Sequence, residues 1–552
     1  MSSTLTIADD VLSDSSSTFA SPASSPAVAP PPLTRKKSLD SQPLPSPTRP
    51  DRPRGLSRSQ TLSRIHPNLE TKCRRKNSEL DALVVDPDVL VRIRRWILGV
   101  AIVDFDVDDG PVITGIYPSL VVFPSEAENI AFSAFPDSPQ FEDGTQHHFF
   151  RIREQPTSLL GDRRPASKDG FIYGFAHFTQ RKDASSRRGF EQRSLVILTH
   201  HPYPALFARI AALLGPLFQQ HGVPMLETAC HNMATWSDPT SGVINELGFL
   251  GSVLSVEIPQ SPEQQQLAGK AYDPRQHILA SSSSFTPPPI LLFEAALSHL
   301  WSLWECLVLC EPLLIFGTSP AQTSQAVWWL RDLLRPLPLT GDVRPYFTIH
   351  DSDHANLASR LPPAAGRVLG VTNPMFERSC AHWPHVLSLG RRVPLNTAAH
   401  GGNTRARAGP EPGWKTRTHT RYVSKDRALL RRLEDACGSG SESDKLEASL
   451  DLRRHFHART TEMLVPLARY LHTLIPTPAE RAASSAAPES LRMRTFSAPA
   501  FLASLKTGAG AALPFRSTAR RKEFYERWLR TPAFGVWLGM QEGIVQGVLE
   551  GG

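Results

Sequence analysis

Residues 96–118 read WILGVAIVDFDVDDGPVITGIYP, and this stretch decides the fold. Its first half, residues 96–106, is rich in β-branched side chains, which is typical of a strand. The cluster Asp-Asp-Gly-Pro at 108–111 is typical of a turn, and residues 111–118 are strand-like again. The sequence therefore predicts a β-hairpin, with ordered structure beginning near Val89.

Strand and helix patterns continue downstream of the hairpin. Three further strand-like segments follow, at 149–153, 170–179 and 194–199. Residues 204–220 then carry apolar side chains at a spacing that covers one face of a helix. Strands followed by a packed helix predict a small α/β layer domain, which we assign to residues 89–240.

A second α/β region is predicted over residues 290–390, after a polar, Ser-rich stretch at 241–289 that we interpret as a linker. Residues 290–310 are typical of an apolar helix, and 312–317 of a short strand. Ser319 has the features of an N-cap, with Pro320 one residue and Gln322 three residues later, so a helix should run to about Leu334. Short apolar strands are expected at 346–350, 367–371 and 385–389. Helices alternating with short strands favour a mostly parallel sheet.

The last third of the chain is predicted to be helical. Residues 391–420 are rich in Gly, Arg and Thr and are interpreted as a flexible loop. Helical patterns follow at 425–437, 444–474, 522–529 and 534–549. The predicted fold class is thus α/β, with an upstream α/β layer, a central α/β sheet and a mainly helical part at 421–552.

Charge and composition separate the tail from the folded part. The chain has 552 residues, a formal net charge of +7 and 49 Pro. Residues 35–76 hold twelve Lys/Arg and three Asp/Glu, or +9, which leaves −2 for all other residues. We therefore interpret residues 1–88 as a disordered, basic Ser/Pro-rich tail. The six Cys without regular spacing, the missing Asn-x-Ser/Thr sequon and the missing secretory or transmembrane pattern favour a reducing, cytoplasmic setting.

Four hydroxyl side chains follow a basic residue by three positions, as basophilic kinases prefer. These phosphorylation candidates are Ser38, Thr61, Ser78 and Ser497. Around Ser497, Arg494 and Pro499 complete a pattern that phosphoserine-binding adaptors recognise. The alternative is that all four lie in merely solvated linkers.

Motifs of bond-making chemistry are missing from the sequence. We find no P-loop, dinucleotide loop, nucleophile elbow or HExxH motif. His350 and His354 could suggest a metal site, but a turn at a strand end capped by aspartates is favoured. Cys306 and Cys310 are interpreted as core residues, and the Asp108–Asp109 pair as turn chemistry or an acidic contact loop. We therefore expect no cofactor, no metal and no catalytic residue.

Eight segments taken together resemble the DENN domain-containing protein 6 family. They occur in family order, from about residue 90 to near the end of the chain. The chain departs from the family pattern in its long tail, at 391–420 and near 480. The segments are WILGVAIVDFDVDDGPVITGIYP (96–118), FSAFPD (132–137), FFRIR (149–153), FIYGFAHFTQRKDASSRRGFEQRSLVIL (171–198), LWECLVLCEPLLIFGTSP (303–320), DVRPYFTIHDS (342–352), GVTNPMFERSCAHWPHVLSLG (370–390) and FYERWLRTPAFGVWL (524–538).

The resemblance implies a tripartite DENN module with a longin-like upstream part. It further implies a guanine-nucleotide exchange factor for a Rab-family small GTPase, cytoplasmic and peripheral on recycling endosomes. Such a factor acts by binding the GDP-bound and nucleotide-free GTPase and makes no bonds itself. A phosphoserine-binding adaptor and a membrane surface are further partners to consider; nucleic acid is not expected.

The resemblance also implies a GTPase surface on the upstream and central parts. Carried over by motif, the hairpin residues would form an exposed turn and the central residues would line one rim of the sheet. Structural roles compete with this interpretation: Tyr346 in the core, Arg344 in an internal salt bridge and Asn373-Pro374 in a turn. The predicted contact residues are Asp106, Asp108, Asp109, Gly110, Pro111, Arg344, Tyr346, His350, Asp351, Asn373 and Pro374.

Three other functions compete with nucleotide exchange. The same surface could bind a GTP-loaded Rab in a non-catalytic adaptor or effector. A GTPase-activating protein would need an arginine finger, but Arg151 and Arg153 lie in a strand-like run, which disfavours a mobile finger. A nucleic-acid binder is supported only by the charge of the tail.

Overall fold

The computed structural model describes residues 80, 83–137, 143–156, 164–187, 189–258, 277–338, 340–391, 409–477, 479–480, 493–505 and 513–551. Most of the predicted tail lies outside these residues. Described structure starts slightly earlier than expected, with helix α1 (Pro87–Arg94). Its N-cap is Asp86, whose Oδ1 accepts hydrogen bonds from the backbone N–H of Asp88 and Val89, and Pro87 occupies the first turn, where it is best tolerated.

The first sheet contains the predicted hairpin. Its strands are β1 (Gly99–Asp106), β2 (Gly110–Tyr117), β3 (Gly144–Arg153), β4 (Phe171–Lys182) and β5 (Phe190–Thr199). They pair in the order β2-β1-β5-β4-β3, and every neighbouring pair is antiparallel. The hairpin and the three later strands predicted from the sequence are therefore confirmed.

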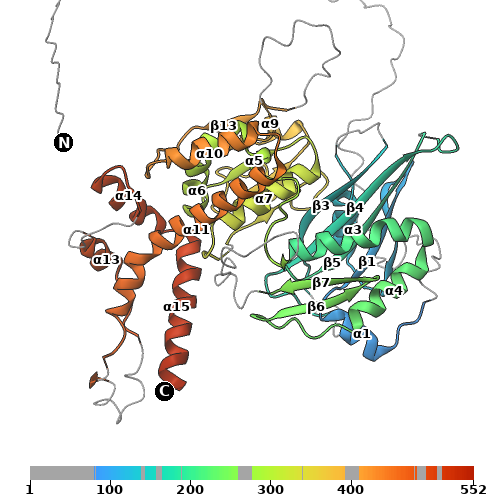
Figure 1. Cartoon of the computed structure of the whole chain (residues 1–552), viewed down its shortest axis with the longest axis horizontal. Coiled ribbons are helices and arrows are strands. Elements are labelled where there is room, and N and C mark those ends of the chain that lie inside the picture. The colour runs from blue at the N-terminus through green and yellow to red at the C-terminus, as the bar shows by residue number, and fades with distance from the viewer. Residues whose placement is uncertain are drawn as a thin grey trace, which may run out of the picture. The chain divides into compact units, whose positions relative to one another are not determined.

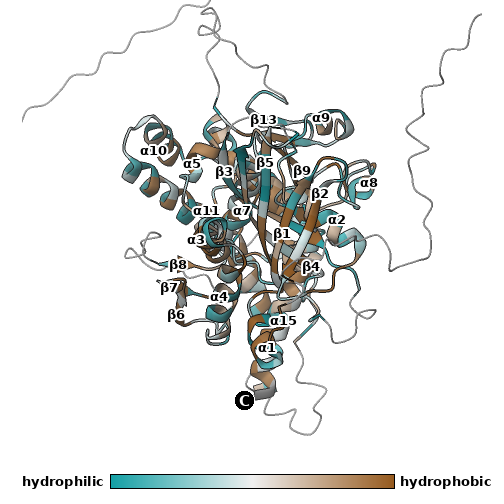
Figure 2. Ribbon diagram, turned by 90° about the vertical axis from the view of Figure 1, so that its right-hand side faces the viewer, coloured by the Kyte–Doolittle hydropathy of each residue, from teal (hydrophilic) through white to brown (hydrophobic). Residues whose placement is uncertain are grey.

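Both faces of the first sheet are covered. Helices α3 (Pro204–His221) and α4 (Val223–Ala234) lie over one face, as Figure 1 shows, and α2 (Pro124–Ser133) lies on the other. Phe207 of α3 packs in one apolar cluster with Phe175 and Ile197, while Ile130 of α2 packs in a second cluster with Val196. Burial on both sides explains the long hydrophobic runs in these strands, which Figure 2 shows as brown ribbon in β1.

Residues 241–289, predicted to be a linker, contain strands, so this prediction is wrong in part. Strands β6 (Ile244–Phe249) and β7 (Ser252–Glu257) form an antiparallel hairpin, and β8 (Ile278–Leu279) pairs with β7. Alternate side chains of β6 are buried, among them Leu247 and Phe249. This alternating pattern covers only a few residues and is followed by a long polar stretch. The average composition of residues 241–289 is therefore polar, although the segment contains strands.

The second sheet is mostly parallel, as predicted. Its order is β10 (Val343–Arg344), β11 (Val368–Val371), β9 (Leu313–Phe316), β12 (His385–Ser388) and β13 (Gly413–Thr416). The first four strands run parallel, and β13 is antiparallel to β12. Strand β13 and the residues beside it correct the loop predicted at 391–420, of which residues 392–408 lie outside the described part of the chain.

Helix α7 (Pro320–Leu333) joins the two sheets. Ser319 is its N-cap, as predicted, and its Oγ accepts from the N–H of Gln322 at 3.3 Å. The Gln322 side chain accepts from the N–H of Thr318 instead of Ser319, so the predicted capping box is only half formed. One turn further along, Ser324 Oγ accepts from the N–H of Phe149 in β3 at 3.2 Å. The helix thus belongs to the second sheet by sequence and packs against the edge of the first.

Two other predictions in the central region need correction. The apolar helix expected at 290–310 is divided into α5 (Pro289–Leu292), a 3-10 helix η5 (Glu294–His299) and α6 (Leu300–Val308). The strand expected at 346–350 is not present, because the side chains of this segment pack into both sheets from an irregular backbone. Two short helices, α8 (His354–Leu357) and α9 (Met375–Ser379), complete the region.

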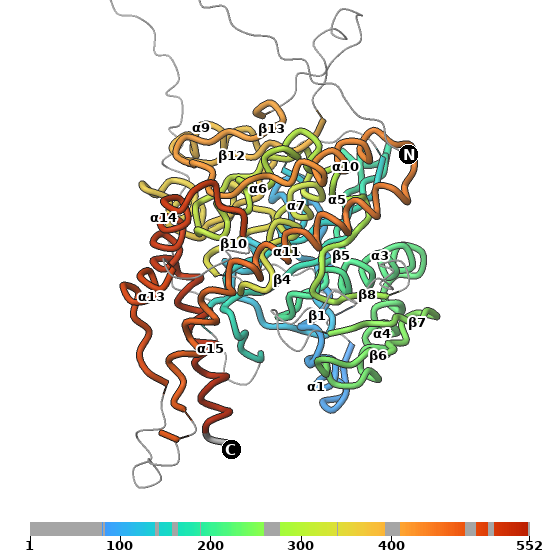
Figure 3. Tube along the Cα trace, turned by 60° about the vertical axis from the view of Figure 1, so that its left-hand side comes forward, coloured from blue at the N-terminus to red at the C-terminus, as the bar shows by residue number. Residues whose placement is uncertain are grey.

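The C-terminal part is helical, as predicted. Its helices are α10 (Arg427–Gly438), α11 (Glu442–His472), α13 (Ala498–Ser504), α14 (Thr518–Trp528) and α15 (Pro532–Gly551) (Figure 3). They share one apolar cluster with α6, in which Trp304 stacks on Phe524 and donates its indole N–H to Thr460 Oγ1 at 3.0 Å. A search of the described helices finds none with the length and apolar character that a bilayer crossing requires.

Adding a methyl group at Gly370 of β11 should destabilise the packing of the irregular 345–350 segment against this strand. A Cβ at Gly370 would lie 2.2 Å from the backbone oxygen of Pro345, which cannot move independently of the strand. We expect Gly370→Ala to lower the free energy of unfolding by about 1–3 kcal/mol, the usual range for overpacking. Urea unfolding followed by tryptophan fluorescence measures this.

Gly248→Ala is the matched control, because a Cβ at Gly248 would meet nothing within 4 Å. Equal free energies of unfolding for the two variants would contradict the prediction, because they would show that the backbone accommodates a Cβ at Gly370 without loss of stability.

Candidate functional site: the surface shared by the two sheets

A fully buried guanidinium holds the two sheets together. Arg344 of β10 lies among the carboxylates of Asp342, Asp351 and Asp353, with 2.5 Å between its NH2 and Asp353 Oδ2. Its NH1 also donates to the backbone oxygen of Arg151 in β3 at 3.2 Å. A buried cation is tolerated when carboxylates and hydrogen bonds replace its hydration, so this arrangement fixes β10 against β3.

Two arginines of β3 complete the contact from the other side. Arg151 donates to the backbone oxygen of Val343 at 3.3 Å and lies 3.4 Å over the ring of Phe171. Arg153 pairs with Asp342 at 2.6 Å and with Asp353 at 3.1 Å. Both side chains are thus engaged in joining the sheets, an arrangement that suits structural arginines better than a mobile arginine finger.

The electrostatics of this cluster follow from burial and from its arginines. Burial works to raise the pKa of Asp342, but Arg344, together with Arg151 and Arg153, outweighs it and holds that pKa below its usual range. At Asp351, burial outweighs Arg344, so its pKa lies above the usual range. Asp342 is therefore stabilised as a carboxylate, whereas ionised Asp351 depends on Arg344 to remain buried.

Tyr346 makes the second contact between the sheets. Its hydroxyl donates to the backbone oxygen of Phe135 at 3.0 Å and accepts from the N–H of Asp137 at 2.8 Å. The ring is 1% exposed and belongs to the apolar cluster under α2. The side chains of Arg344, Tyr346 and Asp351, predicted to line an exposed rim, are buried instead. The competing structural roles, an internal salt bridge and a core tyrosine, are the ones observed.

The predicted hairpin turn is exposed. Asp106 Oδ1 accepts from the N–H groups of Asp108 at 2.8 Å and Asp109 at 3.1 Å, which closes the turn. Gly110 has φ +82°, a conformation that side chains other than glycine rarely adopt. All three aspartates are exposed, while Gly110 and Pro111 are half-buried. The turn thus presents three carboxylates to solvent from a rigid backbone.

Helix α2 connects the hairpin to the central sheet. The rings of Phe132 and His350 stack with centroids 4.0 Å apart and an angle of 17°. Asn129 Nδ2 donates to Ser352 Oγ at 2.9 Å, and the N–H of Ser352 donates to Asn129 Oδ1 at 3.0 Å. At the hairpin, a Cβ on Gly110 would lie 4.0 Å from the Phe132 ring.

Hairpin, α2 and the loop at 350–352 therefore form one continuous surface, which we call the hairpin–α2 surface. Figure 2 shows β2 and α2 on the side of the molecule opposite the β6–β7 hairpin. Glu128, Asn129 and Phe132 were not predicted to belong to the site, although Phe132 begins the segment FSAFPD that resembles the family. The surface is defined by Asp106, Asp108, Asp109, Glu128, Phe132 and His350.

Asn373 and Pro374 follow the carboxyl end of β11, the strand next to β10. Asn373 Oδ1 accepts from the N–H of Met375 at 3.0 Å, which fixes the start of α9. Pro374 is exposed, and Met375 is 61% exposed. The turn expected here is observed, and it lies at the strand-end edge of the sheet where ligand-contacting loops are common.

Of the four phosphorylation candidates, only Ser497 is among the described residues; Ser38, Thr61 and Ser78 lie outside them. Ser497 is the N-cap of α13, with its Oγ 3.4 Å from the N–H of Ala500. Arg494, expected to be read together with Ser497, pairs with Glu480 at 2.5 Å. Modification of these residues stays a prediction.

Possible metal ligands in the described residues are occupied by other partners. Only Cys306, Glu311 and His385 bring suitable atoms together, within 4.8 Å of one another. Glu311 already pairs with His385 at 2.5 Å and with Arg527 of α14. A guanidinium on this carboxylate identifies an ion-paired connection between α14 and the sheet. His350 and His354, for which the sequence favoured a turn over a metal site, have two different aromatic partners: His350 stacks on Phe132, and His354 on Phe347.

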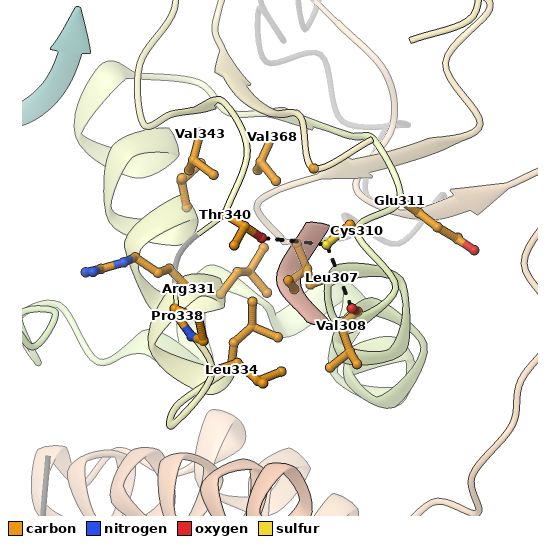
Figure 4. A pocket seen from close by; sticks show the side chains of 15 residues that line it. Leu307, Val308, Cys310, Glu311, Arg331, Leu334, Pro338, Thr340, Val343 and Val368 are labelled. Atoms are coloured by element: carbon orange, nitrogen blue, oxygen red, sulfur yellow. Dashed lines mark hydrogen bonds between the residues drawn. The ribbon is translucent and has the colours of Figure 1, made fainter. Parts of the chain in front are cut away.

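Two cavities of the described residues lie near the central sheet, and both are lined mainly by side chains without carboxylates, apart from Glu311 in the smaller one. Cys310, buried as expected, lines a cavity of about 30 Å³ with Val343 and Val368, and its Sγ lies 3.7 Å from Thr340 Oγ1 (Figure 4). That volume is comparable to one water molecule. A larger hollow of about 720 Å³ lies between α3, β3 and residues 282–287, and its lining includes no Asp or Glu among the described residues.

Comparison with known proteins identifies the family. The chain is 30% identical over 479 residues to Protein DENND6B of Homo sapiens, covering 81% of this chain and 79% of that protein. It is 28% identical over 470 residues to Protein DENND6A of Gallus gallus, with the same coverage. The Protein DENND6 homolog of Dictyostelium discoideum is 28% identical over 489 residues, which are 74% of this chain and 66% of that protein. No protein-family model matches the chain. The chain belongs to the DENN domain-containing protein 6 family.

Removing the central guanidinium should release the contact between the sheets. In Arg344→Met, buried Asp351 loses its cation, while half-buried Asp342 and Asp353 keep only Arg153, so we expect a loss of about 3–5 kcal/mol in the free energy of unfolding. Urea unfolding measures it. Arg360→Met, at an exposed arginine, is the control and should change stability little. Equal stability of both variants would contradict the role assigned to Arg344.

The carboxyl of Asp137, beside the Tyr346 contact, should give the fold a measurable pH dependence. Burial raises the pKa of Asp137 to about 7, so the folded state holds this proton more tightly than the unfolded state, whose pKa is about 4. Its contribution to stability is complete below pH 4 and is lost as the pH rises to 7. We expect Asp137→Asn to become more stable relative to wild type across this window, by at most about 1.4 kcal/mol per pH unit, and to show a constant difference above pH 7. A difference independent of pH would refute this assignment.

Proposed function

We propose that this protein is a guanine-nucleotide exchange factor for a Rab-family small GTPase. The observation that carries the proposal is the hairpin–α2 surface, where Phe132 of α2 lies near the acidic turn of the first sheet and stacks on His350, in the segment after β10. Membership of the DENND6 family supports the same choice. Exchange also requires no acid–base pair or cofactor, and no such centre was expected from the sequence.

Exchange by binding alone is energetically feasible. A GTPase holds GDP through Mg²⁺ and mobile switch loops, and a factor that binds these loops in a nucleotide-free form favours release. Shortening the lifetime of GDP from hours to minutes requires about 2–3 kcal/mol, at roughly 1.4 kcal/mol per factor of ten. An interface of about 1,600 Å² supplies enough differential binding free energy.

The architecture supports this use of binding energy. Ligand-contacting groups on two separate sheets act together only if their relative position is fixed. The Arg344 cluster and the Asn129–Ser352 hydrogen bonds provide this constraint. The exposed carboxylates of Asp108 and Asp109 would attract a cationic segment of the GTPase and increase the association rate.

A cellular setting follows from the same proposal. We place the protein in the cytoplasm, acting peripherally on recycling endosomes, with the family resemblance as the sole support. A partner that recognises phosphorylated Ser497 is a further element of this proposal. Fluorescence imaging of the tagged protein with endosomal markers tests the location.

Charge reversal on the hairpin tests the exchange proposal. We expect purified wild-type protein to accelerate release of labelled GDP from one member of a Rab panel in excess GTP. Asp108→Lys combined with Asp109→Lys should reduce this acceleration about tenfold, equivalent to roughly 1.4 kcal/mol. Glu246→Lys is the control, since Glu246 is exposed on the β6–β7 hairpin away from the proposed contact (Figure 2).

Two results would overturn the proposal. One is no acceleration across the complete Rab panel. The other is tighter binding to GTP-loaded than to nucleotide-free Rab without any release of GDP, which would identify an adaptor or effector that uses the same surface.

A further inference from the structure

A second polar surface lies far along the chain from the hairpin–α2 surface, on the segment that leads from β13 into α10. Two adjoining hollows of about 570 and 510 Å³ open there and share Arg421, Lys425 and Arg516. We call them together the cationic pocket. Its lining cations are Lys415, Arg421, Lys425, Arg427, Arg431 and Arg516, and the described lining includes one carboxylate, Glu434.

A buried carboxylate beneath the pocket fixes its backbone. Glu305 of α6 is 0% exposed, and its oxygens accept from the N–H of Tyr422 at 2.9 Å, the N–H of Val423 at 2.6 Å and His419 Nε2 at 2.8 Å. Three hydrogen bonds to a buried carboxylate hold the 419–423 segment against the core. The pocket is thus built on a rigid base.

A short antiparallel pairing brings the distant cation Arg516 to this segment. Val423 and Phe515 form a β-bridge, the N–H of Ser424 donates to the Pro514 oxygen at 2.9 Å, and the N–H of Arg516 donates to the Tyr422 oxygen at 2.9 Å. Arg421 and Arg516, nearly one hundred positions apart in sequence, therefore line the same hollow.

The positive charge of the pocket is only partly compensated by the described residues around it, because Glu434 is the one carboxylate of the described lining. None of its six cations forms an ion pair with a described carboxylate. Arg421 Nε is buried and has no hydrogen-bond partner there. Burial, and then repulsion from Arg421, lowers the pKa of Lys425 despite the opposing attraction of Glu434. Such crowding of like charges is unfavourable without a ligand and indicates that an anion neutralises it.

The chain itself is a poor source of that anion. In sequence, residues 392–408 and 506–512, which precede the pocket-forming segments, carry Arg or Lys and no Asp or Glu. Residues 35–76 of the N-terminal region have a net charge of +9 and would be repelled by the pocket. The start of α10 is already capped, since Asp426 Oδ1 accepts from the N–H of Leu429 at 2.9 Å.

We propose that the cationic pocket binds a polyphosphorylated inositol headgroup, presented by a phosphoinositide in a membrane or free in solution. Guanidinium groups bind phosphate oxygens in pairs, and four of the six cations are arginines. The hydroxyls of Ser302, Thr416 and Ser424 in the lining suit the ring hydroxyls, and each hollow lies in the size range of small-ligand sites.

Nucleic acid is the less suitable anion. Backbone recognition by single- or double-stranded nucleic acid uses a basic track, often with aromatic faces on which bases stack. Here the cations converge on two hollows, and Trp414, the aromatic residue of the lining, already stacks on His385 with centroids 5.6 Å apart. This site goes beyond nucleotide exchange, since it concerns where the protein is held and not how GDP is released.

Binding of the full-length protein to vesicles and to soluble headgroup tests the proposal. Phosphatidylcholine vesicles containing phosphatidylinositol 4,5-bisphosphate are compared with vesicles carrying equal charge as phosphatidylserine, by co-sedimentation. Inositol 1,4,5-trisphosphate is titrated by calorimetry. We expect Lys425→Glu combined with Arg516→Glu to weaken binding at least about tenfold, because each lost charge-assisted contact contributes strongly.

Two further variants keep the test decisive. Arg360→Glu combined with Arg469→Glu makes the same change in net charge at exposed residues outside the pocket, and should bind like wild type. Lys415→Glu combined with Arg431→Glu changes exposed pocket residues and replaces the first variant if that one unfolds. Circular dichroism checks folding, and GDP release in solution without vesicles reports separately on the exchange activity.

The outcomes separate clearly. Binding of both vesicle and soluble headgroup, lost in the pocket variants, supports the site with a membrane source. Binding of the soluble headgroup alone supports the site with a soluble source. Equal binding to phosphatidylserine vesicles, equal behaviour of pocket and control variants, or binding only to a phosphopeptide or RNA would each overturn the proposal.

Discussion

The guanidinium of Arg344, buried among three carboxylates, is the interaction on which the candidate GTPase surface depends. A charged group that has lost its hydration is costly unless compensating charges remain in place. Asp342, Asp351 and Asp353 provide them from the second sheet, and the backbone oxygen of Arg151 provides a further acceptor from the first. Separating the sheets would break this set, so their relative position is specified electrostatically as well as by packing.

Apolar packing acts in the same direction and makes the contact specific. Tyr346 is a residue of the central region by sequence, yet its ring lies in the apolar cluster under α2 and its hydroxyl bonds to the backbone of Phe135. Trp328 of α7 likewise packs into the cluster beneath α3. Each sheet therefore completes the core of the other, which explains why the 345–350 segment gives up regular strand geometry.

The elements that could be predicted from sequence are those determined by local chemistry. β-branched runs around the Asp-Gly turn produced the β1–β2 hairpin, and Ser319 with Pro320 marked the start of α7. The site was only partly predictable, because exposure of Asp108 follows from the local turn whereas burial of Arg344 and Tyr346 depends on another sheet. Nothing in a stretch such as DVRPYFTIHDS distinguishes a rim from an interface until its partner strand is known.

Beneath the cationic pocket, as between the two sheets, a buried charged side chain holds an irregular segment in place; here the buried group is a carboxylate instead of a guanidinium. Glu305 is a buried anion whose charge is satisfied by two backbone N–H groups and His419, as Arg344 is a buried cation satisfied by carboxylates. In each case one charge inside the core fixes an irregular segment, and that segment presents polar groups to solvent. Irregular backbone that is fixed in this way combines the chemical variety of a loop with the rigidity of a sheet. A protein that acts by binding needs this combination, because any freedom left in the contact residues would be lost on association and subtracted from the affinity.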